Sequence, residues 1–239
     1  ITMPYLARTV GTYGIGKIAF AAAIIVWIQT IADWGFNFTA TRDVAQCKDD
    51  KEKVSHIFTN VLWARCLLAL VSGILLLAAT ILIHSFKESW LIILLTYLMI
   101  PGHIFFPDWF FQAVEKMKYV TLLNILFKFL FTVAVFVFIK EEDDYILQPV
   151  FTTLGYLICG GCALFLILKK WGYSIYRPDF KAIIATIRSS TDVFLNNMLP
   201  NLYNSFSVML LGQFGSTSAI GIFEGGNKFI SIVSQFQSI

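Results

Sequence analysis

The stretch Tyr119–Ile139, YVTLLNILFKFLFTVAVFVFI, decides the fold. At a rise of about 1.5 Å per residue, an apolar helix of this length crosses the ~30 Å hydrocarbon core of a bilayer. Near its middle lies one cation, Lys128. A lysine that faces lipid at that depth costs at least ~2.5–3.5 kcal/mol. Two interpretations follow: Lys128 snorkels or pairs with a neighbouring helix, or it faces a polar cavity that handles anions.

The whole chain has the composition of a membrane protein. Hydrophobic residues make up 57% of it and charged residues 14%, and its mean hydropathy is +0.73. A soluble domain carries about 25% charged residues, and the strands of membrane barrels alternate over about 10 residues. We therefore expect an all-α polytopic membrane protein. The CGGC sequence at Cys159–Cys162 lies inside an apolar run, and we interpret it as small residues for helix packing.

Long apolar runs separated by short polar segments predict about seven spans, preceded by the tail of a truncated first span. Pro101 and Pro107 interrupt one of these runs, and we expect kinks there because proline removes a backbone donor. The chain opens without methionine and stops inside an apolar stretch, so we expect a piece of a longer, transporter-like protein. The predicted spans cover residues 18–38, 57–83, 90–111, 119–139, 145–168, 188–211 and 219 onward.

Basic residues gather in every second connection. Segments 39–56, 112–118 and 169–188 hold eleven Lys and Arg residues, whereas the segments on the opposite side hold four, Arg8, Lys17, Lys87 and Lys140. Loops rich in Lys and Arg stay in the cytoplasm, so we place these three segments on that side. The predicted regions are an N-terminal transmembrane bundle at 1–170, a cytoplasmic amphipathic linker at 171–187 and the start of a C-terminal bundle at 188–239.

A weak internal repeat is visible in two glycine-containing segments. Val10–Ile25, VGTYGIGKIAFAAAII, resembles Phe214–Ile230, FGSTSAIGIFEGGNKFI, with one residue inserted. Each segment follows one span and opens another. Transporters are often built from two related halves, so the repeat predicts a two-lobed protein of about twelve spans.

Charged residues also lie within the spans. Arg65 is about eight residues from the cytoplasmic side and Lys128 about ten, which places both at a depth of ~12–15 Å. Either each cation pairs with an acidic residue such as Asp33 or Asp192, or the two line a cationic cavity open to the cytoplasm. The polar side chains that share one face of the first complete span, four residues apart, are Gln29, Asp33 and Asn37.

A row of amides marks the predicted span 188–211. Asn197, Asn201 and Asn204 recur at helical spacing, so a lipid-facing row would leave several amides unsatisfied. The row therefore serves either as hydrogen-bonding contact between helices or as the wall of a wet passage, and we favour the wall. Pro200 in the same span predicts a bend.

Three stretches together resemble the Wzx-type O-antigen and polysaccharide flippases. They are PYLARTVG at 4–11, DWGFNFTATRD at 33–43 and WFFQAVEKMKYVTLLNIL at 109–126, and the likeness extends through 219–229. The resemblance implies membership of the superfamily that also holds multidrug exporters of the MATE type. It further implies a MATE-like fold of two six-helix bundles in a multi-pass protein of the bacterial inner membrane.

Such flippases move undecaprenyl-pyrophosphate-linked oligosaccharide from the cytoplasmic to the periplasmic leaflet by alternating access. On this resemblance we expect other polysaccharide-assembly membrane proteins as partners, no nucleic acid, no cofactor and coupling to a proton or sodium gradient. Two ion pairs, Arg42 with Asp43 and Glu115 with Lys116, are expected to act as cytoplasmic gates, with solvated loop charges as the alternative. The residues expected to line the substrate passage are Lys128, Arg65, Asn197, Asn201, Asn204, Asp33 and Gln29.

Other function classes fit the sequence less well. An ion-coupled exporter of small cations, also MATE-like, requires an acidic cavity, which Arg65 and Lys128 oppose. A membrane glycan polymerase or ligase requires a sizeable periplasmic loop, and a scaffold leaves the amide row unexplained. The loops carry no phosphate-binding glycine motif, metal-ligand cluster or nucleophile–base pair at a recognisable spacing, so we expect no catalytic or metal site.

Overall fold

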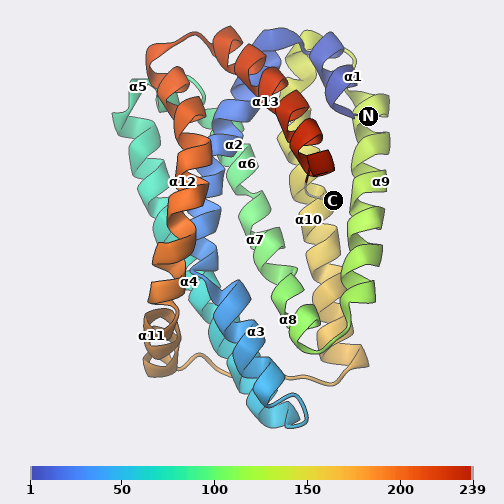
Figure 1. The fold of residues 1–239 in the computed structure, drawn as a ribbon, viewed down its shortest axis with the longest axis vertical. Coiled ribbons are helices and arrows are strands. Elements are labelled where there is room, and N and C mark those ends of the chain that lie inside the picture. The colour runs from blue at the N-terminus through green and yellow to red at the C-terminus, as the bar shows by residue number, and fades with distance from the viewer. Residues whose placement is uncertain (1, 238–239) are drawn as a thin grey trace.

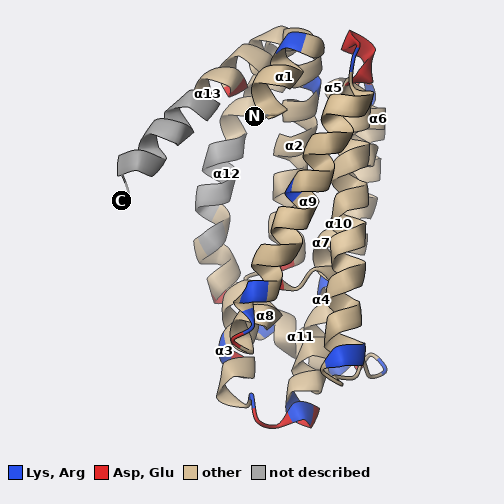
Figure 2. Ribbon diagram, turned by 90° about the vertical axis from the view of Figure 1, so that its right-hand side faces the viewer, with Lys and Arg blue, Asp and Glu red and all other residues tan. Residues whose placement is uncertain are grey.

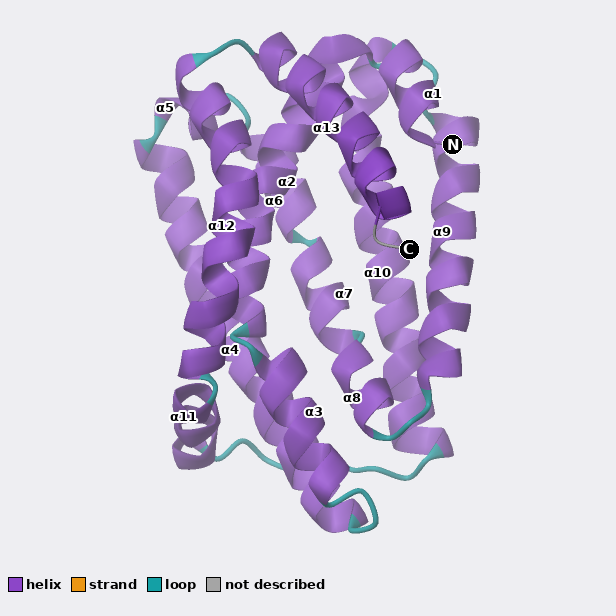
Figure 3. Ribbon diagram, in the orientation of Figure 1, coloured by secondary structure: helices purple, strands orange, loops and turns teal. Residues whose placement is uncertain are grey.

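Helices make up most of the described structure. The computed structural model describes residues 2–237, without the side chains at 197, 199–205 and 228–237. Within residues 2–237 there is no strand, which confirms the predicted all-α class. Long helices lie side by side, and short helices cover their ends (Figure 1, Figure 3). The elements are α1 (Thr2–Thr9), α2 (Gly11–Asp33), α3 (Phe36–Gln46), α4 (Lys51–Leu82), α5 (His84–Lys87), α6 (Trp90–Tyr97), α7 (Met99–Phe105), α8 (Asp108–Ala113), α9 (Met117–Phe138), η1 (Glu142–Ile146), α10 (Leu147–Phe165), η2 (Leu166–Lys170), α11 (Phe180–Ser189), α12 (Thr191–Phe214) and α13 (Thr217–Gln237).

Five of the described helical segments are long and apolar enough to cross a membrane. They match the first five predicted spans. Helices α12 and α13 have the length of a span, with 24 and 21 residues, but are not among the five. The prediction of about seven spans is therefore supported for five of them. The five segments are Gly11–Gln46, Lys51–Leu82, Trp90–Ala113, Met117–Phe138 and Glu142–Lys170.

Charged side chains gather at the two ends of the bundle and are sparse between them (Figure 2). The connections α3–α4, α8–α9 and α10–α11 all lie at one end, and α5 lies at the other (Figure 1). The three basic segments of the sequence therefore share one side, as predicted. We call this side the cytoplasmic end, following the distribution of Lys and Arg, and the opposite side the extracytoplasmic end.

The predicted cytoplasmic loop at 39–56 is wrong over most of its length. Helix α2 ends at Trp34 and Gly35, which have positive φ angles of 41° and 76°, and α3 follows directly. Glycine is required at 35, because a Cβ there would lie 2.9 Å from the backbone nitrogen of Phe194 in α12. After this bend the chain continues as α3. Most of the predicted loop is therefore helical, and only a short turn separates α3 from α4.

The predicted linker at 171–187 is only partly extended. An irregular segment crosses the cytoplasmic end below the bundle and leads into α11 (Figure 1). In α11, Ile183 is buried, whereas Phe180 and Ile184 are exposed. The linker therefore ends in an amphipathic helix, which packs against α4 through its buried side.

The run containing Pro101 and Pro107 is broken into α6, α7 and α8, as the prolines predict. Helix α7 packs closely on α10 through two glycines. A Cβ on Gly160 would lie 2.7 Å from the carbonyl oxygen of Gly102, and a Cβ on Gly102 would lie 2.7 Å from the backbone nitrogen of Leu157. The packing role predicted for the CGGC sequence is therefore confirmed at Gly160.

The two segments of the internal repeat meet at the extracytoplasmic end, where α2 crosses α13 (Figure 1). A Cβ on Gly16 would collide with the carbonyl oxygen of Thr217, and a Cβ on Gly221 would collide with that of Thr12. With the inserted residue counted, Thr12 and Gly16 correspond to Thr217 and Gly221. The contact is thus reciprocal, which is the signature of an approximate two-fold axis between the segments.

Candidate functional site

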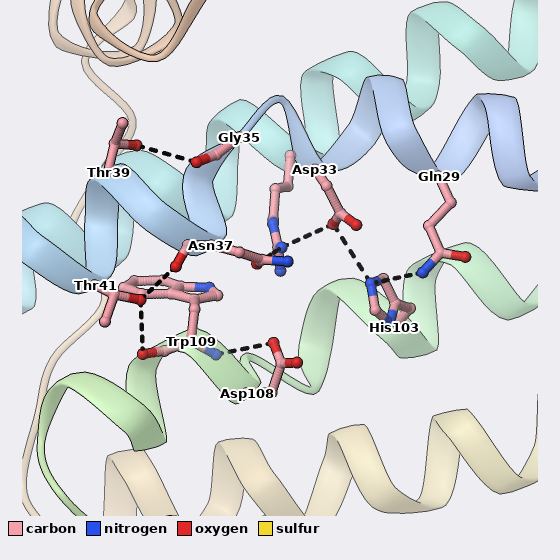
Figure 4. A network of polar contacts seen from close by, with 10 residues as sticks. Gln29, Asp33, Gly35, Asn37, Thr39, Thr41, His103, Asp108 and Trp109 are labelled. Carbon is pink, nitrogen blue, oxygen red and sulfur yellow. Dashed lines mark hydrogen bonds and ion pairs between the residues drawn. The ribbon is translucent and has the colours of Figure 1, made fainter. Parts of the chain in front are cut away.

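A buried ion pair joins α2 to α4. The Arg65 Nη2 atom donates to Asp33 Oδ1 at 2.7 Å and to Asn37 Oδ1 at 2.6 Å. Figure 4 shows Asp33 and Asn37 pointing toward the same space. The Arg65 side chain is 1% exposed and that of Asp33 is 20% exposed, so the guanidinium depends on this carboxylate for compensation. Of the alternatives predicted for Arg65, the structure shows the ion pair with Asp33.

His103 of α7 extends the group from a third helix. Its Nε2 atom lies 3.4 Å from Asp33 Oδ1 and 3.0 Å from Nε2 of Gln29 (Figure 4). The same carboxylate oxygen, Asp33 Oδ1, therefore faces both the guanidinium and the imidazole. We call these five residues the Asp33 cluster; they are Gln29, Asp33, Asn37, Arg65 and His103.

The Asp33 cluster has hydrogen-bond donors to spare. Among the described residues, Nε and Nη1 of Arg65 are buried without a partner. An unsatisfied buried donor costs about 1–3 kcal/mol, so these atoms favour any oxygen that reaches them. When His103 is neutral, the positive charge of the Arg65 guanidinium and the negative charge of the Asp33 carboxylate give the cluster a net charge of zero. The cluster can therefore accept an oxygen ligand at Arg65 by rearranging its own hydrogen bonds.

A cavity of about 430 Å³ lies next to the Asp33 cluster, on its cytoplasmic side. Asn37 belongs to both, because it binds Arg65 and also lines the cavity. The two sequence stretches that resemble flippases, 33–43 and 109–126, supply most of the wall. The lining residues are Asn37, Phe38, Thr41, Arg42, Asp108, Trp109 and Gln112.

Local hydrogen bonds hold the two sides of this cavity together. The Thr41 hydroxyl lies 2.6 Å from the carbonyl oxygen of Asn37 and 3.3 Å from that of Trp109, which ties α3 to α8. Asp108 Oδ1 accepts from the backbone N–H of Trp109 at 2.8 Å (Figure 4). Trp109 is 2% exposed, so its ring packs in the hydrophobic core and holds this wall of the cavity in place.

The structure contains one of the two ion pairs predicted at the cytoplasmic end. Arg42 lies 2.9 Å from Asp43, as predicted. Glu115, however, pairs with Lys48 at 2.9 Å and so joins the α3–α4 turn to the α8–α9 turn. Lys116 instead lies over the ring of Trp171 at 3.9 Å from its centroid. Neighbouring residues 115 and 116 point to different partners because Glu115 has a positive φ of 58°.

The Lys48–Glu115 pair lies in water at the cytoplasmic end, where both side chains are largely exposed. The hydrogen bond to Glu115 and its negative charge raise the pKa of Lys48 above its ordinary value. Exposed pairs of this kind contribute little to stability. The pair is thus a weak link between two turns, which can open without a large cost.

Lys128 and Arg65 occupy different environments. The Lys128 side chain is exposed on α9, the least buried of the five candidate spans, whereas Arg65 is enclosed by the bundle. In the described part of the chain, Lys128 makes no ion pair. The structure therefore does not gather the two predicted cations into one group.

The amide row lies on α12, but its side chains at 197, 201 and 204 lie outside the described residues. The start of α12 is well defined by its contacts with the bend after α2. The Trp34 and Phe194 rings stack at 4.0 Å, and the hydroxyls of Thr39 and Ser190 are 2.7 Å apart. Asp192, the other acidic partner considered for the cations, is exposed.

Two members of the Asp33 cluster were not singled out as site residues by the sequence. Asn37 shares the four-residue spacing of Gln29 and Asp33, so its place on the same face was visible. His103 had no such signal, because a single histidine beside a proline is weak evidence for a site. Only the packing of α7 against α4, the helix that also carries Arg65, brings His103 to Asp33.

Comparison with known proteins gives a family and two relatives. The family described as "Polysaccharide biosynthesis protein" matches residues 1–238. A protein of Escherichia coli (strain K12), described as "Putative O-antigen transporter", is 27% identical over 95% of this chain and 55% of its own length. A protein of Shigella dysenteriae with the same description is 24% identical over 95% of this chain and 57% of its own length.

The chain therefore spans a little over half the length of these curated relatives. No solved structure matches it. In the described part of the chain, no three His, Cys, Asp or Glu side chains come close enough together to hold a metal ion.

Proposed function

The chain belongs to the polysaccharide biosynthesis protein family, and on that premise we propose that it works as a flippase for a lipid-linked glycan. It is a multi-pass protein of the bacterial inner membrane. The proposed substrate is an undecaprenyl-pyrophosphate-linked oligosaccharide, such as an O-antigen repeat unit. The proposed reaction moves it from the cytoplasmic to the periplasmic leaflet by alternating access of two MATE-like bundles.

One observation carries the proposal: a charged, hydrogen-bonding cluster lies inside an apolar bundle, beside a cavity at the cytoplasmic end. Ionisable groups within membrane spans are costly and usually mark a transport pathway. Here they come with the two unsatisfied donors of Arg65 and with a cavity of about 430 Å³. Oxygen-rich sugars and phosphates are the ligands that such donors favour.

The proposed roles of the remaining predicted residues follow from their chemistry. Lys128, which is exposed on α9, attracts the pyrophosphate electrostatically. Arg65 exchanges one of its partners in the Asp33 cluster for a phosphate or sugar oxygen. The amides at 197, 201 and 204 donate to sugar hydroxyls. The pairs Arg42–Asp43 and Lys48–Glu115 open and close the cytoplasmic entrance.

We propose the proton as the coupling ion, because of the place of His103. Imidazole is the side chain that changes charge between about pH 5 and 8. Protonated His103 would donate to Asp33 Oδ1 and compete with Arg65 for that oxygen, since both nitrogens already face it. A proton taken up at His103 thus loosens the ion pair and releases Arg65 for an anionic ligand.

The alternatives are less well supported. A MATE-like exporter of small cations would need a free acidic site, whereas the carboxylate of Asp33 is already paired with Arg65. A membrane glycan polymerase or ligase would act as an enzyme, whereas both relatives carry the description of a transporter. The transporter description of both relatives therefore favours the flippase.

Complementation tests the proposal directly. The full-length gene is expressed in a strain that lacks its flippase, and lipid-linked repeat units are counted on each leaflet. The proposal predicts that repeat units appear on the periplasmic leaflet and that surface glycan returns. Accumulation of lipid-linked units on the cytoplasmic leaflet, with the protein present in the membrane, would contradict it.

A further inference from the structure

A second buried cation lies far from the Asp33 cluster, near the extracytoplasmic end of α2. Lys17 is 8% exposed. Its ammonium group donates to the Ser89 hydroxyl at 2.8 Å and lies 3.5 Å from the carbonyl oxygen of Glu88. Among the described residues, no carboxylate comes within ion-pair distance of it. Lys17 is therefore a buried charge held by two neutral oxygens and, at 5.6 Å from the ring centroid, by the face of Tyr13, with no anion beside it, which is costly.

A cavity of about 140 Å³ opens beside this ammonium group. Its wall combines α2 with the turn that contains α5 and with the connection between α12 and α13. Hydroxyls and amides predominate in the polar part of this wall. The side chains that supply them are Ser85, Ser89, Gln213 and Thr217.

These groups offer donors rather than negative charge. The Ser89 hydroxyl accepts from Lys17 and so keeps its own proton for another acceptor. The side chains of Ser85, Gln213 and Thr217 take part in no hydrogen bond with another described residue, so they are available. Glu88 also borders the cavity, but its carboxylate lies 3.2 Å from Nε2 of His84 on the exposed surface.

From this geometry we propose that the Lys17 cavity binds a phosphate group. A phosphate oxygen can take the free protons of the ammonium group, and the remaining oxygens can accept from the hydroxyls and the amide. The bound anion supplies the charge that the cavity lacks. It also bridges α2 to the α12–α13 connection, so it fastens the two repeat segments together at their crossing.

The phosphate can come from a soluble anion or from a lipid headgroup, because the cavity lies at the end of the bundle where headgroups gather. Both sources present the same oxygens to Lys17. This site does not depend on the proposed transport activity. A protein that moves no glycan can still bind phosphate here, so the two proposals fail independently.

The test uses the purified full-length protein and measures its unfolding temperature with inorganic pyrophosphate against chloride at matched ionic strength. A ligand at many times its dissociation constant stabilises the folded state, and we expect a rise of about 2 °C or more. Lys17→Met should make the rise clearly smaller than in the wild type, and Lys17→Arg should keep it. The matched control is Lys87→Gln, which removes an exposed lysine at the same end and should also keep the rise.

A second arm distinguishes the two sources. The protein is placed in nanodiscs of phosphatidylcholine or phosphatidylglycerol, and bound phospholipid is counted by native mass spectrometry after release. A Lys17-dependent response to pyrophosphate identifies a soluble anion, and Lys17-dependent retention of phosphatidylglycerol identifies a headgroup. Either result supports the phosphate site. Responses that are absent in both arms, or equal in the wild type and Lys17→Met, would overturn it.

Discussion

Helix α2 is fixed to the rest of the molecule at two places, and the two contacts use different physics. Near its start, Gly16 meets α13 through backbone atoms that leave no room for a side chain. Near its end, Asp33 meets Arg65 through charge. At the Gly16 contact only a residue without a side chain fits against α13. At the Asp33 contact, Arg65 can exchange its hydrogen-bond partner for another oxygen. Shape therefore fixes the crossing of the two repeat segments, and charge supplies the part that can respond to a ligand.

The contrast also explains why the charged contact lies deeper in the bundle. A glycine crossing depends only on close packing and works at the extracytoplasmic end, where α2 and α13 begin (Figure 1). An ion pair has little value in water but a large one when it is enclosed. The cost of enclosing Arg65 is offset only while Asp33 remains paired with it. A change in the charge of either partner, or of His103, is therefore felt strongly.

The largest effect is expected when the charged contact is broken on one side. Arg65→Met leaves the Asp33 carboxylate without its cation, and breaking a buried pair costs about 3–5 kcal/mol. Thermal unfolding of the full-length protein in detergent measures the loss. A loss of less than about 1 kcal/mol in the free energy of unfolding would mean that water or His103 compensates the charge of Asp33. The contact would then not depend on the ion pair.

The glycine crossing should respond to size rather than charge. Gly16→Ala places a methyl group against the Thr217 carbonyl, and overpacking of this kind costs about 1–3 kcal/mol. Gly161→Ala is the matched control, because nothing lies within 4 Å of the position of its Cβ. The control should be neutral or slightly stabilising, since alanine is the better helix former. Equal unfolding temperatures for the two variants would show that the crossing is loose.

His103→Gln tests whether the charged contact responds to protons. Glutamine keeps a hydrogen-bonding group near Asp33 and Gln29 but does not titrate. Under the proposed proton coupling through His103, we expect the rate of glycan translocation by the wild type to depend on pH between 5.5 and 8, and the rate in the variant to vary much less. A pH profile that is identical in the variant would remove His103 from the coupling step.

The exposed pair of the cytoplasmic end should matter least. Glu115→Gln removes the partner of Lys48, and we expect the unfolding temperature to change by less than about 2 °C. Because Glu115 raises the pKa of Lys48, the contribution of the pair is present below the ordinary lysine pKa and is lost as the pH rises through the raised value. Unfolding measured from pH 8 to 11 should therefore show a small decline in the wild type that is absent in the variant.

Much of the fold was predictable because hydropathy and proline act locally. The first five spans, the shared side of the basic segments and the breaks close to Pro101 and Pro107 all follow from the chain itself. The helical course of α3 was missed, because its polar residues suggested a loop. Its helix forms on a bend at Trp34 and Gly35 that packs against α12, which is a tertiary contact.

The site was only partly predictable, for a related reason. Residues on one helix face, such as Gln29 and Asp33, are related by spacing, so their grouping could be predicted. Pairing across helices depends on how the helices rotate about their axes. The sequence therefore left the partner of Arg65 open, joined Glu115 to the wrong lysine and gave only a weak signal for His103, a single histidine within a span.

The most direct test of the account is translocation by the double variant Asp33→Asn, Arg65→Met. Removing both charges together is expected to be close to neutral for stability, because no unpaired charge remains in the bundle. The full-length double variant should therefore fold and reach the membrane like the wild type. We predict that it leaves lipid-linked repeat units on the cytoplasmic leaflet. Transfer to the periplasmic leaflet at the wild-type rate would contradict the functional role of the Asp33 cluster.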